Sequence, residues 1–211
     1  MPTIERIVVA DEPERWRDAG FDVDGDRCRI GRIDLALAGP TAGRRIAGWS
    51  LRGVASTDLD GLPTERADSP LPEPARPHPN GAVAVDHVVA FTPALERTVQ
   101  AAERAGLPLR RIREGPTPGG AMRQAFFRVG EAILELIEHP PDAPAAADPD
   151  APARFWGLAL LVEDLDRTAA VLGDRLGEAR DAVQEGRRIA TLRREAGLAV
   201  PVAFMTTPPA G

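Results

Sequence analysis

Two side chains that could bind a metal ion or move a proton stand near opposite ends of one stretch of this chain, residues 85–141. His87 lies within a β-branched, apolar run over 85–91, and Glu135 lies within a second apolar run over 130–138. An imidazole and a carboxylate are both ligands for divalent transition metals, and the same two groups can act as a general base. Either use requires that the two runs fold as strands which bring these side chains together.

The sequence leaves the role of each group open. His87 could instead be a core or pocket-wall histidine that is hydrogen-bonded to a neighbour. Glu135 stands between two leucines on an apolar strand, and a carboxylate that is buried there needs a partner. That partner could be His87, or Arg123 or Gln124 on the adjoining strand. Catalytic and metal-ligating roles are therefore expected on His87 and Glu135.

The residues of a ligand pocket are expected around this pair. Side chains alternate between the two faces of a strand, so Phe126 shares a face with Gln124. Trp156 lies near the start of a later strand and could add a second aromatic wall. The expected pocket residues are Gln124, Phe126, Arg123 and Trp156, and the alternative for either aromatic ring is an ordinary place in the core.

One group of elements is predicted to position these residues. The pattern indicates a strand over 84–91, an amphipathic helix over 93–105, a strand over 107–113, and a hairpin of strands over 122–129 and 132–138. Gly130 and Glu131 stand where the hairpin should turn. The order of elements is therefore βαβββ.

The same order of elements is predicted twice more. In the last third of the chain, the expected elements are a strand, a helix and three strands, over 155–162, 165–176, 178–184, 187–193 and 200–206. Residues 4–54 also indicate a strand, a short helix and three strands. Within them, Ile33, Leu35 and Leu37 alternate with smaller or polar residues, as in a half-buried strand.

Proline-rich segments separate these groups. Six prolines occur between residues 63 and 81, so residues 63–82 are expected to be an extended linker with His78 as a solvated linker residue. Residues 140–153 are expected to be a second linker. The predicted domains are an N-terminal module over 1–62 and a main domain over 83–211, whose modules span 83–141 and 154–207.

Composition excludes several classes of function. The 211 residues carry a net charge of −6 without a basic stripe, so nucleic acid is not an expected partner. All 26 basic residues are arginine, which excludes a lysine Schiff base. No apolar run is long enough to span a membrane. The single cysteine, Cys28, is expected to be a buried, inert thiol in a cytoplasmic protein.

The second and third groups of elements are an internal repeat. Residues 94–98 (Ala-Leu-Glu-Arg-Thr) match residues 164–168 (Asp-Leu-Asp-Arg-Thr), and Glu-His-Pro-Pro over 138–141 corresponds to Thr-Thr-Pro-Pro over 206–209. A repeat of this length indicates paired modules and not a solenoid. With Asp-His-Val-Val at 86–89, this pattern resembles the vicinal oxygen chelate superfamily, which includes glyoxalases, bleomycin-resistance proteins and extradiol dioxygenases.

The resemblance implies a fold and a type of site. The fold would be α+β, with paired βαβββ modules forming a curved mixed sheet around a pocket and a degenerate third module over residues 4–54. Enzymes of the superfamily bind a divalent ion through the first and last strands of each module. Here those positions fall on His87 and Glu135 in one module, and on Gly157 and Ala203 in the next.

Two functions therefore remain open. The leading hypothesis is a protein that binds a small organic molecule, with a degenerate metal site at His87 and Glu135. The alternative is a lyase, isomerase or dioxygenase that uses one divalent ion, Mn, Fe, Ni or Zn. A metal-free general base formed by the pair is a further extrapolation. The resemblance also allows a homodimer.

Overall fold

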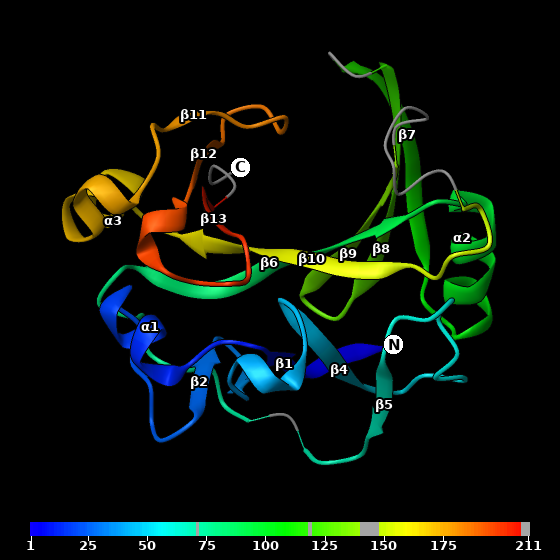
Figure 1. Ribbon diagram of the computed structural model, residues 1–211, viewed down its shortest axis with the longest axis horizontal. Coiled ribbons are helices and arrows are strands. Elements are labelled where there is room, and N and C mark those ends of the chain that lie inside the picture. Colours follow the sequence, from blue (N-terminus) through cyan, green and yellow to red (C-terminus); the bar gives the residue numbers. More distant parts are fainter. Residues whose placement is uncertain (71, 118–119, 140–147, 208–211) are drawn as a thin grey trace. The chain divides into compact units, whose positions relative to one another are not determined.

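The computed structural model describes residues 1–70, 72–117, 120–139 and 148–207 (Figure 1). Contacts group the chain into two compact units, each of which combines separate segments of the sequence. Unit 1 consists of Met1–Glu5, Gly48–Ser69 and His87–Trp156, and unit 2 of Arg6–Ala47, Pro70–Asp86 and Gly157–Gly211. Each unit therefore takes part of its structure from the N-terminal third of the chain.

The N-terminal third folds in the order predicted for it. Its elements are β1 (Thr3–Val9), α1 (Pro13–Asp18), β2 (Arg27–Ile30), β3 (Ile33–Leu37), a 3₁₀ turn η1 (Pro40–Ala42), β4 (Ile46–Arg52) and β5 (Thr64–Ala67). The strand, helix and three strands expected over residues 4–54 are confirmed. Strand β5 lies inside the segment expected to be a linker, and its backbone pairs in parallel with β4.

The two repeated groups also follow the predicted order. The first contains β6 (Ala82–Thr92), α2 (Leu95–Arg104), β7 (Leu109–Thr117), β8 (Gly120–Val129) and β9 (Ala132–Glu138). The second contains β10 (Arg154–Val162), α3 (Leu165–Leu172), η3 (Gly173–Arg175), β11 (Arg180–Asp181), β12 (Arg188–Thr191), η4 (Arg194–Ala196) and β13 (Val202–Thr206). The expected linker over 140–153 lies partly outside the described residues.

The fold is α+β with mixed sheets, as the sequence predicted. In unit 1 the strands of the larger sheet follow the order β10–β6–β9–β8–β7, and in unit 2 they follow the order β11–β12–β13–β10–β6. Strand β6 is parallel to β9, whereas β8 is antiparallel to both β9 and β7. Strand β10 is likewise parallel to β13 in unit 2.

Helix α2 covers one face of the sheet of unit 1, packing against β8 and β9 (Figure 1). Side chains on that face are fully buried, among them Val88, Phe127, Leu134 and Leu136. Burial of each large apolar side chain contributes about 1.5–3 kcal/mol. The alternation along β6, β8 and β9 therefore assigns every second residue to this core and the remaining residues to the opposite face.

The predicted hairpin turn between β8 and β9 is confirmed at Gly130. Its φ is +69°, in the left-handed region that favours glycine, and a Cβ there would lie 2.7 Å from Thr3 Cγ2. The turn sets the register in which Val129 pairs with Ala132 and Phe126 pairs with Glu135.

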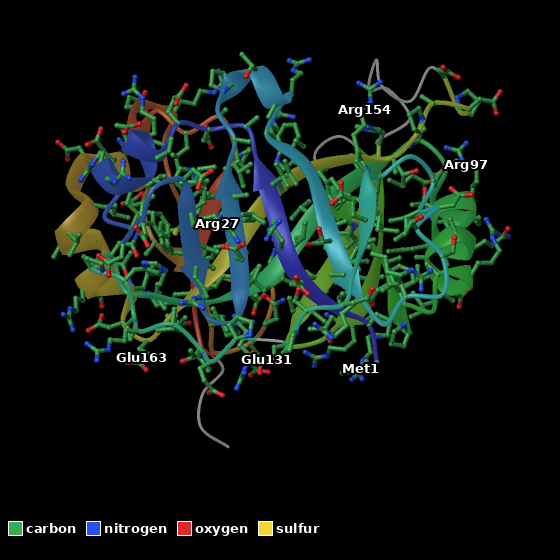
Figure 2. All side chains as sticks on the ribbon, turned by 90° about the horizontal axis from the view of Figure 1, so that it is seen from below. Met1, Arg27, Arg97, Glu131, Arg154 and Glu163 are labelled. Atoms are coloured by element: carbon green, nitrogen blue, oxygen red, sulfur yellow. The ribbon has the colours of Figure 1, made fainter. Side chains whose placement is uncertain are left out.

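In unit 2 the alternation predicted for β3 is confirmed. Ile33, Leu35 and Leu37 are buried, while Asp34 lies on the other face beside the arginines of neighbouring strands. Arg27 of β2, labelled in Figure 2, donates from Nε to Asp34 Oδ1 at 3.0 Å. Cys28 is buried as expected, and burial raises the pKa of its thiol to about 12, which leaves it inert at neutral pH.

The prediction that His78 is a solvated linker residue is wrong. Only 5% of the residue is exposed, and both ring nitrogens have backbone partners within unit 2. Nδ1 accepts the backbone N–H of Asp22 at 3.0 Å, and Nε2 lies 3.1 Å from the carbonyl oxygen of Arg29. The proline-rich segment is therefore buried at His78. The imidazole forms hydrogen bonds with backbone groups that are distant in sequence.

Across the described ranges, no helix is long and apolar enough to cross a membrane.

Candidate functional site

The face of the unit 1 sheet that α2 leaves uncovered brings together the two residues singled out by the sequence. His87 of β6 pairs in register with Ile133 of β9, and Val89 pairs with Glu135, so the two polar side chains share a face on adjacent parallel strands. His87 Nε2 lies 3.4 Å from Glu135 Oε2. Their side chains are only 16% and 12% exposed. The two groups therefore meet, which the sequence had left as one of several possibilities for Glu135.

Gln124 joins this pair from the next strand. Its Nε2 donates a hydrogen bond to Glu135 Oε1 at 2.5 Å. The two carboxylate oxygens of Glu135 therefore face different groups, one the amide of Gln124 and the other the imidazole of His87. This arrangement supplies the partner that a largely buried carboxylate requires.

Apolar side chains surround the polar group. We define the open face as the half-exposed side chains on this side of β6, β9 and β8: His87, Val89, Phe91, Ile133, Glu135, Ile137, Gln124 and Phe126. Phe126 pairs in register with Glu135 and so lies beside it. Polar groups that can exchange protons or hydrogen bonds thus stand in an apolar setting, as in many small-molecule sites.

Aromatic rings gather at the end of the open face where β6 meets β10. The Phe91 ring stacks on His139 with centroids 5.0 Å apart and contacts the Trp156 ring edge-on at 5.2 Å. Trp156 is 38% exposed. Burial lowers the pKa of His139, with the charge of Arg154 acting in the same direction, so the stacked imidazole favours its neutral form.

Arg123 lies on the opposite face of the sheet, because it is one residue from Gln124 and strand side chains alternate. Its guanidinium pairs with Glu96, Glu114 and Glu138 at 2.5, 3.1 and 3.2 Å. The hydrogen bond from Arg123 holds the pKa of Glu96 below its usual value. Arg123 is thus directed towards α2 and not towards Glu135.

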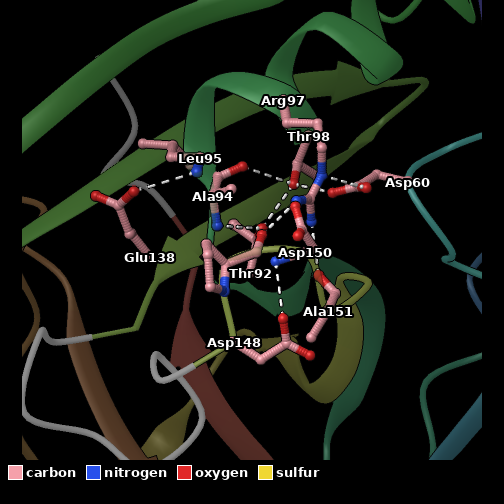
Figure 3. A network of polar contacts seen from close by, with 11 residues as sticks. Asp60, Thr92, Ala94, Leu95, Arg97, Thr98, Glu138, Asp148, Asp150 and Ala151 are labelled. Carbon is pink, nitrogen blue, oxygen red and sulfur yellow. Dashed lines mark hydrogen bonds and ion pairs between the residues drawn. The ribbon is translucent and has the colours of Figure 1, made fainter.

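The same face anchors the beginning of α2 (Figure 3). Glu138 Oε1 accepts the backbone N–H of Leu95 at 3.1 Å, and Thr92 Oγ1 accepts that of Ala94 at 3.1 Å. Asp60 accepts a hydrogen bond from Arg97 Nε at 2.7 Å. Residues of β6 and β9 that face the helix therefore bind the start of α2. These contacts fix the position of the two strands that carry His87 and Glu135.

A metal ion held by three protein side chains does not fit the donors present. Catalytic sites of this kind use about three protein ligands with open positions for substrate. Among the described residues, no group of three His, Cys, Asp or Glu side chains is placed to hold an ion. His87 and Glu135 supply two donors, and one Glu135 oxygen already accepts a hydrogen bond from Gln124.

The corresponding positions of the last module offer no side-chain donor. A Cβ on Gly157 would lie 2.6 Å from the carbonyl oxygen of Pro201, so the backbone occupies the space a ligand would need. Ala203 pairs in register with Ala159 on β10. Also in unit 2, Asp86 of β6 forms an ion pair with the buried Arg187 at 2.9 Å.

Part of this site was not predicted from the sequence. Phe91, Val89, Ile133 and Ile137 were not singled out, and neither was the stacking of Phe91 on His139. The available signal was the alternation along β6 and β9, which places every one of these apolar residues on the side of His87 or Glu135. The sequence alone does not show which face of a strand remains exposed.

Comparisons with known proteins agree with this architecture. A family model described as a glyoxalase-like domain matches residues 85–210. A variant of 4-hydroxymandelate synthase from Streptomyces coelicolor has a similar fold, with a TM-score of 0.64 at 17% identity over 99% of this chain and 93% of that chain. Methylmalonyl-CoA epimerase from Mycobacterium tuberculosis gives a TM-score of 0.48 at 22% identity over 61% of this chain and 91% of that chain. No curated protein matches.

Proposed function

This chain belongs to the glyoxalase-like domain family, and from that premise we propose that it binds a small organic molecule on the open face of unit 1. His87, Glu135 and Gln124 would provide the polar contacts. The apolar side chains around them, with Phe126 and Trp156, would contact the body of the ligand. The binding of a molecule, with or without its chemical conversion, is the function that this face supports best.

One observation carries the proposal: Glu135 contacts both His87 and Gln124, and these three largely buried polar side chains stand among apolar side chains on the open face. A structural ion pair or hydrogen bond does not require such an apolar rim. Covering about 150 Å² of apolar surface contributes about 4 kcal/mol at about 25 cal/mol per Å². The polar group would then orient the ligand, because a bound molecule that buried one of these groups without a hydrogen bond would lose about 1–3 kcal/mol of binding free energy.

A fluorescent neutral probe tests the proposal directly. N-phenyl-1-naphthylamine becomes bright in apolar sites, so we expect saturable fluorescence with the full-length protein. Ile137→Glu places a charge on the half-exposed apolar rim and should weaken binding about tenfold or more, equivalent to about 1.4 kcal/mol.

The matched control is Val183→Glu, which adds the same charge at a side chain that is 71% exposed in unit 2. This variant should bind the probe as the wild type does. Equal affinities for the wild type and Ile137→Glu, or no saturable binding by the wild type, would refute the proposal.

The contact between His87 and Glu135 favours a second candidate function, proton transfer with a bound carbon acid. Glu135 would take the proton, since its Oε2 faces His87 and its Oε1 is held by Gln124. The test follows exchange of the methyl protons of acetophenone in D₂O by NMR. Glu135→Gln should abolish protein-dependent exchange while probe binding persists, and unchanged exchange in this variant would exclude Glu135 as the base.

A further inference from the structure

Two arginines extend the open face across the edge strand β7. Arg111 pairs in register with Phe126, and Arg113 pairs with Gln124, so both side chains lie on the side of the sheet that carries Glu135. The guanidinium carbon of Arg111 stands 4.9 Å from the centroid of the Phe126 ring. This contact shows independently of the register that Arg111 shares the open face with Phe126.

Arg111 and Arg113 differ in their ion pairing from Arg123, which lies on the other face of the same hairpin. Arg123 is engaged by three carboxylates, one of which, Glu114, belongs to β7 itself. Within the part of the chain that the structure describes, no carboxylate forms an ion pair with Arg111 or Arg113. Both side chains are exposed. Their donors are therefore available to a ligand at neutral pH, where a guanidinium is always charged.

The charge on this face is opposite to that of the chain. The protein has a net charge of −6, yet the open face and its extension carry Arg111, Arg113 and Arg128 against a single carboxylate, Glu135. Arg128 also donates to the carbonyl oxygen of Glu131 at 3.1 Å. Glu135 already has neighbours in Gln124 and His87. The positive charge of the β7 arginines therefore has no counterpart among the described side chains of the face.

We infer that the ligand of the open face is an aromatic or otherwise apolar organic anion whose oxyanion group is held by Arg113 and Arg111. The inference rests on the proposed binding function and specifies its ligand class. An arginine fork matches the two oxygens of a carboxylate or the oxygens of a sulfonate or phosphate. Phe126, between the arginines and Glu135, would contact the apolar body of the ligand.

The sheet geometry also sets the size of such a ligand. Arg111, Phe126 and Glu135 are in register across β7, β8 and β9, and adjacent strands are about 4.8 Å apart, so the backbones of Arg111 and Glu135 are about 10 Å apart. A molecule with one or two rings spans this distance. Its oxyanion would lie at β7, and its opposite end would reach His87 and Glu135.

Two probes that differ in one anionic group test the inference. 8-anilino-1-naphthalenesulfonate and N-phenyl-1-naphthylamine share their rings, and only the first carries a sulfonate. We expect Arg113→Gln to weaken binding of the sulfonate probe about tenfold and to leave binding of the neutral probe within about twofold. Arg111→Gln should act in the same direction. In the wild type, added salt should weaken binding of the sulfonate probe and leave binding of the neutral probe unchanged.

Arg104→Gln is the matched control, because it removes the same charge from an exposed position at the end of α2. It should leave the affinity for both probes unchanged. The inference is overturned if Arg113→Gln and Arg104→Gln bind the sulfonate probe equally, or if both probes lose affinity equally in Arg113→Gln. Failure of the proposed function looks different: neither probe would then respond to Ile137→Glu.

Discussion

Gly157 occupies the first-strand position that corresponds to His87, and the structure predicts that this position does not tolerate any side chain. Its backbone lies in β10 of unit 2, where the N–H of Leu158 donates to the carbonyl oxygen of Pro201 at 2.9 Å. A Cβ on Gly157 would meet that oxygen at 2.6 Å and Pro201 Cβ at 3.2 Å. Gly157→Ala must therefore move backbone and not merely a flexible side chain.

The expected cost follows from this contact. Overpacking by a single carbon typically destabilises a folded protein by about 1–3 kcal/mol, and loss of the Leu158 hydrogen bond would add about 1 kcal/mol. For a chain of this size each kcal/mol lowers the melting temperature by about 2–4 °C. We therefore expect Gly157→Ala to melt about 4–16 °C below the wild type, and Gly157→His to be less stable still.

Thermal and urea unfolding, followed by circular dichroism, measure this change. Gly115→Ala is the control, since a Cβ at Gly115 on β7 would meet no atom within 4 Å. It should be close to the wild type in stability. A Gly157→Ala protein as stable as the control would show that Pro201 can move freely, and the steric reason for the missing ligand would then be wrong.

Three further predictions concern the ion pair, the buried imidazole and the metal. Arg187→Met removes a buried guanidinium that binds Asp86 and the carbonyl oxygen of Thr206, and it should destabilise the protein by about 3 kcal/mol in urea unfolding; a change below about 0.5 kcal/mol would contradict this. Burial lowers the pKa of His78, so below about pH 6.5 the unfolded chain binds a proton that the folded chain resists, and stability should fall as the pH drops. His78→Gln should flatten part of that fall below about pH 6.5, and an unchanged slope would argue against it. Protein produced with Mn, Fe, Ni and Zn supplied should contain well under one equivalent of metal; stoichiometric metal that is lost in a His87→Ala/Glu135→Ala double variant would instead support the metal-dependent alternative.

Much of the fold was accessible from local sequence patterns. The alternation of Ile33, Leu35 and Leu37 predicted strand β3, and the glycine at 130 predicted the turn of the β8–β9 hairpin. Such signals are local, because they reflect the two-residue period of a strand and the φ angles that only certain residues adopt readily. Strand β5 was missed because residues 64–67 lie next to a proline-rich segment, and the pairing with β4 is not visible in their composition.

The site was predicted in part for the same reason. Strand alternation placed Gln124 and Phe126 on one face, as the structure has them. The choice of Gln124 over Arg123 as the partner of Glu135 depends on the register between β8 and β9, in which Phe126 pairs with Glu135. That register belongs to the pairing of two strands and is not visible in the residues of one strand alone.

By itself, the sequence determined the βαβββ order and the internal repeat and singled out His87 and Glu135, because hydrophobic period and repeat offset are properties of the chain alone. Only the tertiary structure decided the rest. His78, which was expected to be solvated, is buried and contacts backbone groups of Asp22 and Arg29. The carbonyl oxygen of Pro201 occupies the space that a side chain at position 157 would need. The tertiary structure also aligned Arg111 and Arg113 with Phe126 and Gln124. These outcomes depend on strand register and on atoms that are distant along the chain, and local residue patterns do not encode either.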